Sequence, residues 1–338
     1  MLKHQPTIKE IAGALDVSIA TVSRALQNDP RIGLRTRMRV QDMAKQLHYV
    51  PNQVAKQLRQ HRSFTIGVLL PQLGEEFFTL AIAGIEDALE GKGYQVLIAQ
   101  SRDKKEREIT TIRSFLNSRV DGVIASIAAE TVDNQHFLEL QNFGIPVVFF
   151  DRAPKDFPAH KVRCNVKAGA EAVVRHLLGK GFRRIALLNG PASLEISQER
   201  LQGFHAAMAA AGVAIPVGFE KFTDLSSEDV SRKMQELFDS AGCPEAIFAF
   251  NDYVAFHAMR WCKEKGKLPG RDVVFASFAN LPITNFMETP PAVSVEQFAY
   301  KMGEQAAEVL LGILENPSGE EAGFQEIMIE TELVVRVG

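Results

Sequence analysis

The segment TIKEIAGALDVSIATVSRALQN, residues 7–28, carries side chains that could hydrogen-bond with DNA bases. Small, hydroxyl, amide and guanidinium groups follow one another on the outer faces of one short predicted helix, which suits entry into the major groove. These side chains are Ala20, Thr21, Ser23, Arg24 and Gln27. The pattern indicates recognition of DNA, and the alternative is an ordinary helical hairpin in a small bundle.

Two short helices joined by a tight turn are expected to position this cluster. Thr7 and Glu10 have the spacing of a capping box at the start of the first helix, and apolar residues recur behind them at helical intervals. Ser18 is a favoured N-cap for the second helix, in which Val22 and Leu26 face inward. The sequence therefore predicts a helix-turn-helix.

The charge pattern separates this N-terminal module from the rest of the chain. A third helix is expected over residues 35–49, and a short helix begins at Pro51 and Asn52. Residues 1–62 hold 11 Lys and Arg against 4 Asp and Glu, a net charge of +7, whereas the remaining residues hold 27 against 37, or −10. A basic module suited to phosphate groups thus precedes an acidic body.

Beyond residue 65, short apolar runs alternate with amphipathic segments, which is typical of parallel strands separated by helices. Strands are expected at 65–70, 95–99, 122–126 and 146–150, and then at 184–189, 245–250, 273–277 and 292–295. The pattern predicts an α/β core with two consecutive doubly wound sheets. Ligands bind such sheets beside the carboxyl ends of the strands, so the residues just past those ends are candidates for a pocket.

Composition and motifs exclude several classes of function. A headpiece of about 60 residues leaves roughly 275 residues, enough for two lobes with sizeable cores. Three scattered cysteines suggest neither a zinc site nor disulfides, and no secretory or membrane-spanning segment is evident. The two GKG segments follow helices rather than strands, and no catalytic motif is present. We expect a cytoplasmic protein that is not an enzyme and needs no cofactor or metal.

The order and spacing of TIKEIAGALDVSIATVSRAL, TRMRV and YVPNQVAKQL resemble the LacI family of bacterial transcription regulators, and the resemblance extends over essentially the whole chain. It implies a three-helix headpiece with a hinge helix, followed by two lobes like those of periplasmic sugar-binding proteins. The implied domains are 1–62, with the hinge at 52–58, and 63–338. The first lobe is expected at about 63–162 with 281–291, and the second at about 163–280 with 292–338, with crossings near 161–165, near 280–287 and close to the C-terminus.

The resemblance also implies roles for residues of the headpiece. Ile19 and Ala20 match the positions that read base edges, where both could contact thymine methyl groups, although Ile19 could instead face inward beside Val22. Arg24, one turn later, could reach a guanine or a phosphate. Asp16 replaces a turn glycine and would adopt the left-handed conformation at small cost. The predicted contacts to DNA are Thr7, Ser18, Ile19, Ala20, Thr21, Ser23, Arg24, Gln27, Asn52, Ala55 and Leu58.

The hinge implied by the resemblance suggests how DNA binding could be switched. Leu58 matches the leucine that wedges between base pairs and kinks the duplex, and Ala55 matches a small residue at the contact between paired hinges. Seven residues are too few to be stably helical alone. Order in the hinge could therefore follow the arrangement of the lobes. No leucine-heptad tail follows the core, so we expect a homodimer on a pseudo-palindromic operator.

For the ligand pocket, the resemblance points to Phe77 and Phe78, one of which could instead belong to the core. Arg152 could clamp a carboxylate, a phosphate or vicinal hydroxyls, or it could form a surface salt bridge. In the pair Asn251 and Asp252, we expect Asn251 to face the ligand and Asp252 to cap the following helix. The predicted pocket residues are Phe77, Phe78, Ser126, Asp151, Arg152, Arg200, Asn251, Tyr253, Asn280 and Gln297.

Two departures from the family pattern bear on the effector. The segment Phe278-Ala279-Asn280 stands where many relatives have Phe-Asp-Asp, and Leu225 replaces an aromatic stacking residue. These changes weigh against a simple monosaccharide effector of the kind that relatives bind. A sugar, sugar acid or sugar phosphate is still the expected class of effector, and the arginines favour an anionic one. The alternatives are a sugar sensor that does not bind DNA and a regulator recruited by a phosphorylated partner protein.

Overall fold

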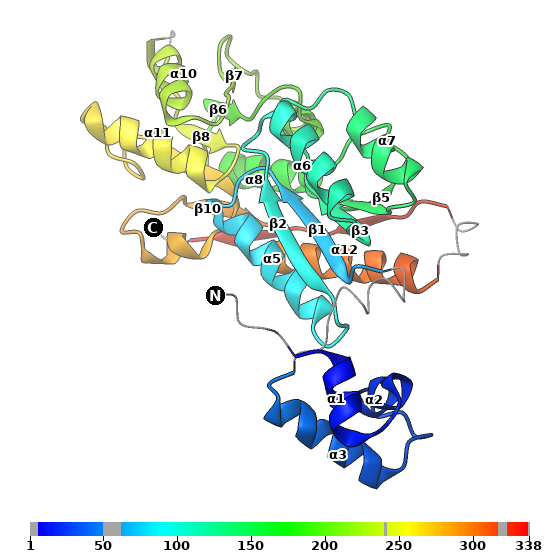
Figure 1. Ribbon diagram of the computed structural model, residues 1–338. Coiled ribbons are helices and arrows are strands. Elements are labelled where there is room, and N and C mark those ends of the chain that lie inside the picture. The colour runs from blue at the N-terminus through cyan, green and yellow to red at the C-terminus, as the bar shows by residue number, and fades with distance from the viewer. Residues whose placement is uncertain (1–5, 50–61, 240–241, 317–322, 337–338) are drawn as a thin grey trace. The chain divides into compact units, whose positions relative to one another are not determined.

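The computed structural model describes residues 6–49, 62–239, 242–316 and 323–336 (Figure 1). The chain divides into two units, Met1–Ser63 and Phe64–Gly338, and the sequence analysis placed this boundary one residue earlier. The described part of the first unit is helical, and the second unit contains two six-stranded sheets with helices packed against them. The predicted α/β class with an N-terminal helical module is confirmed.

Helices α1 (Ile8–Leu15), α2 (Ile19–Leu26) and α3 (Leu34–Gln46) form the N-terminal unit. All three contribute buried side chains to one core, namely Ile11, Ala12, Val22, Ala25, Val40 and Ala44. Asp16 ends α1 in the left-handed conformation, with a φ of 52°, as its side chain permits. The turn between α1 and α2 is therefore as tight as the sequence analysis predicted.

The first sheet of the second unit has the strand order β11-β5-β4-β3-β1-β2, and all its neighbouring pairs are parallel. Its strands are β1 (Thr65–Leu70), β2 (Gln95–Gln100), β3 (Gly122–Ala125), β4 (Val147–Phe150), β5 (His160–Cys164) and β11 (Glu326–Ile329). One face packs against α5 (Glu76–Leu89) and α12 (Ala299–Glu315), and the other against α6 (Lys105–Asn117) and α7 (Gln135–Asn142). Burial on both faces explains why the central strands are continuous apolar runs.

The second sheet has the order β12-β10-β9-β8-β6-β7, in which only β12 is antiparallel to its neighbour. Its strands are β6 (Ile185–Asn189), β7 (Glu220–Phe222), β8 (Ala246–Ala249), β9 (Val274–Ala279), β10 (Val293–Glu296) and β12 (Glu332–Val335). Helices α8 (Val166–Gly179) and α9 (Glu195–Ala210) pack together on this sheet, as do α10 (Ser227–Asp239) and α11 (Asp252–Glu264). The short 3-10 helix η1 (Pro282–Phe286) links β9 to β10.

Strands β5, β7 and β11 were missed by the sequence analysis. β5 has the sequence HKVRC and β7 is only EKF, so neither shows the apolar run of a buried strand. β11 and β7 are edge strands, which need fewer buried side chains than central ones. Near the C-terminus, β12 belongs to the second sheet, whereas β11, which precedes it, belongs to the first.

The chain crosses between the lobes at Cys164–Val166, at Glu296–Ala299 and at Ile329–Glu332. The predicted middle crossing, near 280–287, is wrong because this segment joins β9 to β10, which are neighbours in the second sheet. Residues 281–291 therefore belong to the second lobe, and α12 and β11 belong to the first.

The packing of α12 explains its place in the first lobe. A Cβ built on Gly84 of α5 would lie 2.0 Å from the carbonyl oxygen of Tyr300, and one built on Gly303 would lie 2.0 Å from that of Ala81. The two helices thus touch through their backbones, which only glycine allows at these positions. This contact depends on tertiary structure and has no signature in the local apolar pattern.

Candidate DNA-binding helix and ligand cleft

Helix α2 is held in place at its first turn by its own cap. The Ser18 hydroxyl accepts a hydrogen bond from the Thr21 backbone N–H at 3.0 Å, and the two hydroxyl oxygens lie 2.8 Å apart. At the start of α1, the Thr7 backbone N–H donates to the Glu10 carboxylate at 2.6 Å, as the capping box predicts. Both helix starts in the motif are therefore satisfied locally.

The outer face of α2 is available for contact. Ile19 is 47% exposed, so the alternative that it faces inward is wrong. Ala20, Arg24 and Gln27 are exposed along the same helix, whereas Thr21 and Ser23 are half-buried. Within the described residues, Arg24 forms no ion pair. This arrangement leaves a cationic hydrogen-bond donor one turn beyond two apolar side chains.

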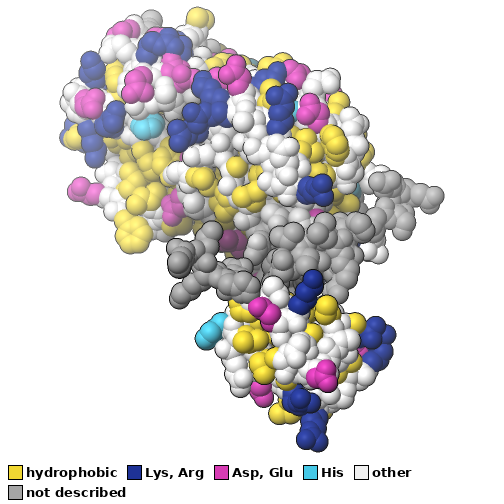
Figure 2. Space-filling view, in the orientation of Figure 1, with side chains coloured by type: hydrophobic (Ala, Val, Ile, Leu, Met, Phe, Trp, Pro, Cys, Tyr) yellow, Lys and Arg dark blue, Asp and Glu magenta, His cyan; other side chains and the backbone are white. Residues whose placement is uncertain are grey.

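The loop from α2 to α3 has anchors that the sequence analysis did not identify. Arg37 donates to the backbone oxygen of Asn28 at 3.1 Å, and the Gln41 amide donates to the Asn28 side-chain oxygen at 2.7 Å. Asp29 pairs with Arg31 at 2.7 Å, and this hydrogen bond lowers the pKa of Asp29 to about 2. In Figure 2, Lys and Arg side chains project from the lower end and the right edge of the headpiece.

The predicted hinge contacts Asn52, Ala55 and Leu58 lie outside the described residues.

In the second unit, a cleft of about 420 Å³, its open mouth included, lies between the carboxyl ends of the two sheets. Eight of the predicted pocket residues line it: Phe77, Phe78, Asp151, Arg152, Arg200, Asn251, Tyr253 and Gln297. Five other residues line it that were not predicted from the sequence, namely Glu75, Ile196, Phe250, Ala279 and Leu281. Each follows or ends a strand or begins a helix, but a lone apolar residue or glutamate there carries no distinctive signal.

Two predicted residues do not line the cleft. Ser126 is buried, and its hydroxyl accepts a hydrogen bond from the Arg152 backbone N–H at 3.4 Å, so it supports the strand end that carries Arg152. Asn280 donates to Glu296 at 2.8 Å and accepts from Arg336. These bonds hold its side chain within the second lobe, which contradicts the predicted place in the pocket.

Aromatic rings and one ion pair form the first-lobe side of the cleft. Phe78 packs edge-to-face against Phe77 and Phe150, and both Phe77 and Phe78 are buried while lining the cleft. Arg152 is only 3% exposed and pairs with Asp103 at 2.6 Å. The predicted alternative of a surface salt bridge is therefore wrong, because this pair is largely withdrawn from solvent.

The two carboxyl groups that line this side have perturbed ionisation. Burial raises the pKa of Asp151 to about 6 and that of Glu75 to about 7, and the nearby charge of Arg152 opposes both shifts. Asp151 also adopts the left-handed conformation, with a φ of 55°. Near neutral pH, Glu75 can therefore donate or accept a hydrogen bond, whereas Asp151 is mainly an acceptor.

On the second-lobe side, Arg200 is the central polar residue. Its guanidinium carbon lies 4.2 Å from the ring centre of Phe250 and 4.3 Å from that of Phe278. The side chain is 2% exposed, and burial lowers the pKa of Arg200 to about 10. The two rings stabilise the cation and fix the plane in which it can meet a ligand.

Of the neighbouring pair Asn251 and Asp252, Asn251 lines the cleft as expected but also provides the helix cap that was expected of Asp252. The Asn251 side-chain oxygen caps α11 by accepting from the Val254 backbone N–H at 2.9 Å, while Asn251 also lines the cleft. Asp252 is fully buried and accepts from the Leu281 backbone N–H at 2.7 Å and from the Ser277 hydroxyl. The predicted cap at Asp252 is wrong, because its carboxylate joins β9 to the loop after it instead.

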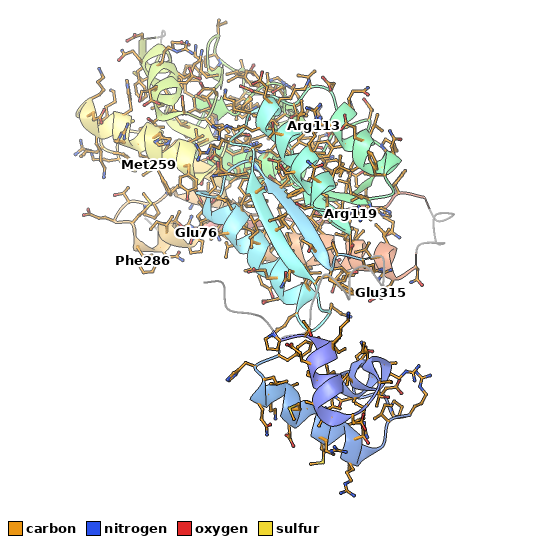
Figure 3. All side chains as sticks on the ribbon, in the orientation of Figure 1. Glu76, Arg113, Arg119, Met259, Phe286 and Glu315 are labelled. Carbon is orange, nitrogen blue, oxygen red and sulfur yellow. The ribbon has the colours of Figure 1, made fainter. Side chains whose placement is uncertain are left out.

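Several hydrogen bonds join the lobes around the cleft. The Tyr253 hydroxyl donates to the Gly74 carbonyl and accepts from the Glu76 backbone N–H, each at 3.3 Å. The Glu76 carboxylate accepts from the Ile283 backbone N–H at 3.4 Å, and Figure 3 shows Glu76 at the start of α5, near the segment that carries Phe286. A change in the separation of the lobes would alter these contacts.

Neither a metal site nor a membrane-spanning helix is found within the described ranges. No group of three His, Cys, Asp or Glu side chains gathers as a metal site would require. None of the described helices is both long enough and apolar enough to span a bilayer.

Comparison with known proteins agrees with this arrangement. Residues 63–336 match the family of periplasmic binding proteins and the sugar-binding domain of the LacI family, and residues 7–52 match the bacterial regulatory proteins of the lacI family. The chain is 32% identical to the ribose operon repressor of Bacillus subtilis (strain 168), with 94% of this chain and 95% of the relative covered.

Solved structures show the same fold. A complex of the transcriptional regulator CelR with cellobiose has a TM-score of 0.73 at 26% identity and covers 98% of this chain and 99% of that one. The lac repressor dimer bound to operator and the anti-inducer ONPF has a TM-score of 0.85 at 24% identity and covers 98% of each chain, which is a likeness of fold.

A helix-turn-helix module followed by a two-lobed core with a polar cleft defines a DNA-binding transcriptional regulator controlled by a small molecule. The chain belongs to the LacI family of bacterial regulatory proteins.

Proposed function

We propose that this protein represses transcription in the cytoplasm as a homodimer on a pseudo-palindromic operator, and that a sugar or sugar derivative in the cleft controls its affinity for DNA. The observation that carries the proposal is the cleft itself, in which charged and amide side chains from both lobes face one space between aromatic rings. Such polar groups between aromatic walls suit a polyhydroxy ligand. The named relatives that bind cellobiose or regulate a ribose operon are consistent with this class.

In this proposal, α2 enters the major groove. Ile19 and Ala20 meet thymine methyl groups, and Arg24 donates to a guanine. Thr7 and Ser18 begin the two helices, where the free backbone N–H groups can bind phosphates. Thr21, Ser23 and Gln27 complete the surface that faces DNA. Asn52, Ala55 and Leu58 act in the hinge, a role that rests on the sequence resemblance.

The switch would operate through the contacts between the lobes. A ligand that binds one arrangement of the lobes more tightly than another shifts the population toward it. Tyr253 lines the cleft and bonds to Gly74 and Glu76 of the opposite lobe, so ligand binding and the distance between the lobes depend on the same side chain.

The test begins with selection of duplexes from a randomised library by the purified full-length protein at low ionic strength. The selected duplex is then titrated by fluorescence anisotropy, with and without a panel of sugars, sugar acids and sugar phosphates. We expect a two-fold symmetric consensus, an affinity that falls steeply with salt, and a change in affinity of tenfold or more with at least one compound. Failure to select any duplex would overturn the proposal.

A further inference from the structure

This inference rests on the proposed function, because it concerns what sets the balance between arrangements of the lobes. Among the described residues, the first lobe buries two arginines, Arg152 and Arg163. Arg152 pairs with Asp103 at 2.6 Å and lies 4.0 Å from Asp151, so both of these acids belong to its own lobe. Arg163 differs, since two of its three acidic neighbours belong to the second lobe.

Arg163 reaches across the boundary between the lobes. It lies near the end of β5, one residue before the chain crosses into the second lobe. Its Nη2 atom donates to the Glu199 carboxylate at 2.8 Å, and its Nη1 atom lies 3.5 Å from the Glu195 carboxylate. Both acids are on α9 of the second lobe. Nη1 also donates at 3.3 Å to Glu326 on the neighbouring strand β11 of the first lobe, so acids of both lobes share one guanidinium.

The charges at this boundary are unequal and partly withdrawn from water. Three carboxylates surround the Arg163 guanidinium, and Lys161, on the same strand, is the other cation whose charge acts on Glu195 and Glu326. The Arg163 side chain is 7% exposed, and those of Glu195 and Glu199 are each 24% exposed. Because water screens such charges only in part, loss of the cation should drive the two acids of α9 away from the first lobe.

The first two turns of α9 face the boundary on one side and the cleft on the other. Glu195 and Glu199 are four residues apart and lie on the face that meets Arg163. Ile196 and Arg200 are also four residues apart and line the cleft. The position of these two turns therefore determines both the contact with the first lobe and the shape of the cleft.

A second contact holds the same end of α9. The Ser193 hydroxyl, just before the helix, donates to the Ala129 carbonyl oxygen of the first lobe at 2.9 Å. Ser193 is exposed and uncharged, whereas Arg163 is buried and charged, so Arg163 makes the stronger of the two contacts. Both contacts act in the same direction, because each joins the start of α9 to the first lobe.

We propose that Arg163 is a positioning residue that holds the start of α9 against the first lobe and so stabilises the closed arrangement, in which hydrogen bonds join the lobes across the cleft. Arg163 is not among the described residues that line the cleft, so it acts on the effector only through the arrangement of the lobes. A ligand that contacts both sides favours the closed arrangement, and a protein that responds to it must also populate an open one. The strength of the Arg163 contact therefore sets how much effector the switch requires.

The first test needs no effector, because two backbone amides report the separation of the lobes. The Glu76 N–H donates to the Tyr253 hydroxyl, and the Ile283 N–H donates to the Glu76 carboxylate, each across the boundary. Hydrogen–deuterium exchange of the full-length protein, followed by mass spectrometry, measures both amides. We expect Arg163→Gln to speed their exchange about tenfold and to leave the amides of β3 within about twofold of the parent.

Two acids that contact the same guanidinium provide the matched comparison. Glu199→Gln removes a charge that reaches Arg163 from the second lobe, whereas Glu326→Gln removes one from the lobe of Arg163 itself. Glu199→Gln should speed exchange at the two reporting amides about threefold or more, and Glu326→Gln should stay within about twofold of the parent. Because Glu199→Gln preserves the size of the side chain, it tests the bridge even if Arg163→Gln does not fold. Unchanged exchange in Glu199→Gln, or equal exchange in the two acid variants, would overturn the proposal.

The second test measures the switch itself in the parent and in Arg163→Gln. The probe is the compound of the sugar panel that changes the operator affinity of the parent most. By calorimetry it should bind Arg163→Gln about tenfold or more weakly, and at saturation it should bring the operator affinity of the variant within about threefold of the parent value. Without the compound, the operator affinity of the variant should equal that of the parent or move away from the saturated value. A move toward the saturated value would contradict the proposal.

The two tests separate failure of this inference from failure of the proposed function. A parent that selects no duplex contradicts the proposed function, while exchange at the two amides still decides the role of Arg163. A parent that binds its operator and responds to a compound, with unchanged exchange and unchanged affinity for that compound in Arg163→Gln, contradicts this inference alone.

Discussion

The headpiece and the cleft both use arginine, but they place it in opposite environments. Arg24 stands exposed on α2, where water and salt screen its charge. Arg200 is buried between two phenylalanine rings, where burial lowers its pKa to about 10. The difference teaches that the affinity for DNA should depend mainly on ionic strength. The affinity for the effector should depend instead on which groups lie next to each buried charge.

The largest effect should come from removing the buried cation. Arg200→Gln should weaken effector binding by 100-fold or more, about 2.7 kcal/mol, because it removes the donors that face the ligand. Operator affinity without effector should stay within about threefold. The measurements are calorimetry with the effector and fluorescence anisotropy with the selected duplex.

The matched control is Arg175→Gln, since Arg175 is a 63% exposed arginine on α8. It should leave both affinities unchanged. If Arg200→Gln responds to effector as the parent does, Arg200 does not bind the ligand, and the contrast between the two arginines loses its functional meaning.

Truncation of Arg24, the exposed arginine of α2, should have a smaller effect on operator affinity, and the size of this effect should depend on the DNA sequence. Arg24→Ala should cost roughly 1 to 3 kcal/mol at the operator if Arg24 reads a guanine, with most of the loss confined to duplexes that contain that base. Anisotropy titrations against single-base variants of the selected duplex measure this. A uniform loss across all duplexes would instead assign Arg24 to a phosphate.

The cleft should show a pH dependence of stability that comes from its two acids with raised pKa values, Asp151 and the half-buried Glu75. Burial raises the pKa of Glu75 to about 7 from an ordinary 4.5. Within this window the folded chain retains a proton that the unfolded chain has lost, so the free energy of unfolding falls as the pH rises from about 4.5 to 7. Arg152, which lowers this pKa, and Asp103 and Asp151, which raise it, are the charges that act on Glu75.

Glu75→Gln should therefore flatten the pH profile of unfolding by about 1 to 2 kcal/mol, a figure reduced to allow for partial solvent screening. Denaturant titrations between pH 4.5 and 8 provide the measurement. The exposed Glu86, on the same helix, supplies the control variant Glu86→Gln. A parent profile that is already flat in this window would contradict the raised pKa.

The smallest effect concerns the cap that holds α2. Ser18→Ala removes the acceptor for the Thr21 backbone N–H and should destabilise the headpiece by about 1 kcal/mol. Ser18→Thr keeps the acceptor and should restore most of the stability. Thermal unfolding followed by circular dichroism compares the three proteins, and an unchanged transition in Ser18→Ala would show that the cap is dispensable.

Features that depend on nearby residues could be predicted from the sequence. The capping of α1 at Thr7, the left-handed turn at Asp16 and the apolar central strands all follow from interactions within a few residues or from burial on both faces of a sheet. The family resemblance correctly predicted that Arg152, Arg200 and Asn251 line the cleft, because family motifs identify their positions near the ends of strands.

Features that depend on residues distant in the sequence could not be predicted in this way. Asn280 directly follows the end of β9, where a pocket residue was expected, yet Arg336, 56 residues away, and Glu296 hold its side chain within the second lobe. Asn251 and Asp252 are adjacent polar residues, but Asn251 caps α11 whereas the Asp252 carboxylate binds Ser277 and Leu281, which are distant in the sequence.

The sequence by itself therefore determined the helix-turn-helix, the two α/β lobes and the family, because short-range periodicity, caps and motifs are written along the chain. The tertiary structure alone decided which lobe holds α12, and it brought carboxylates from both lobes to the buried Arg163. The physical reason is that the partner of a buried charge is set by which segments the folded chain brings within a few ångströms, and no local pattern specifies that.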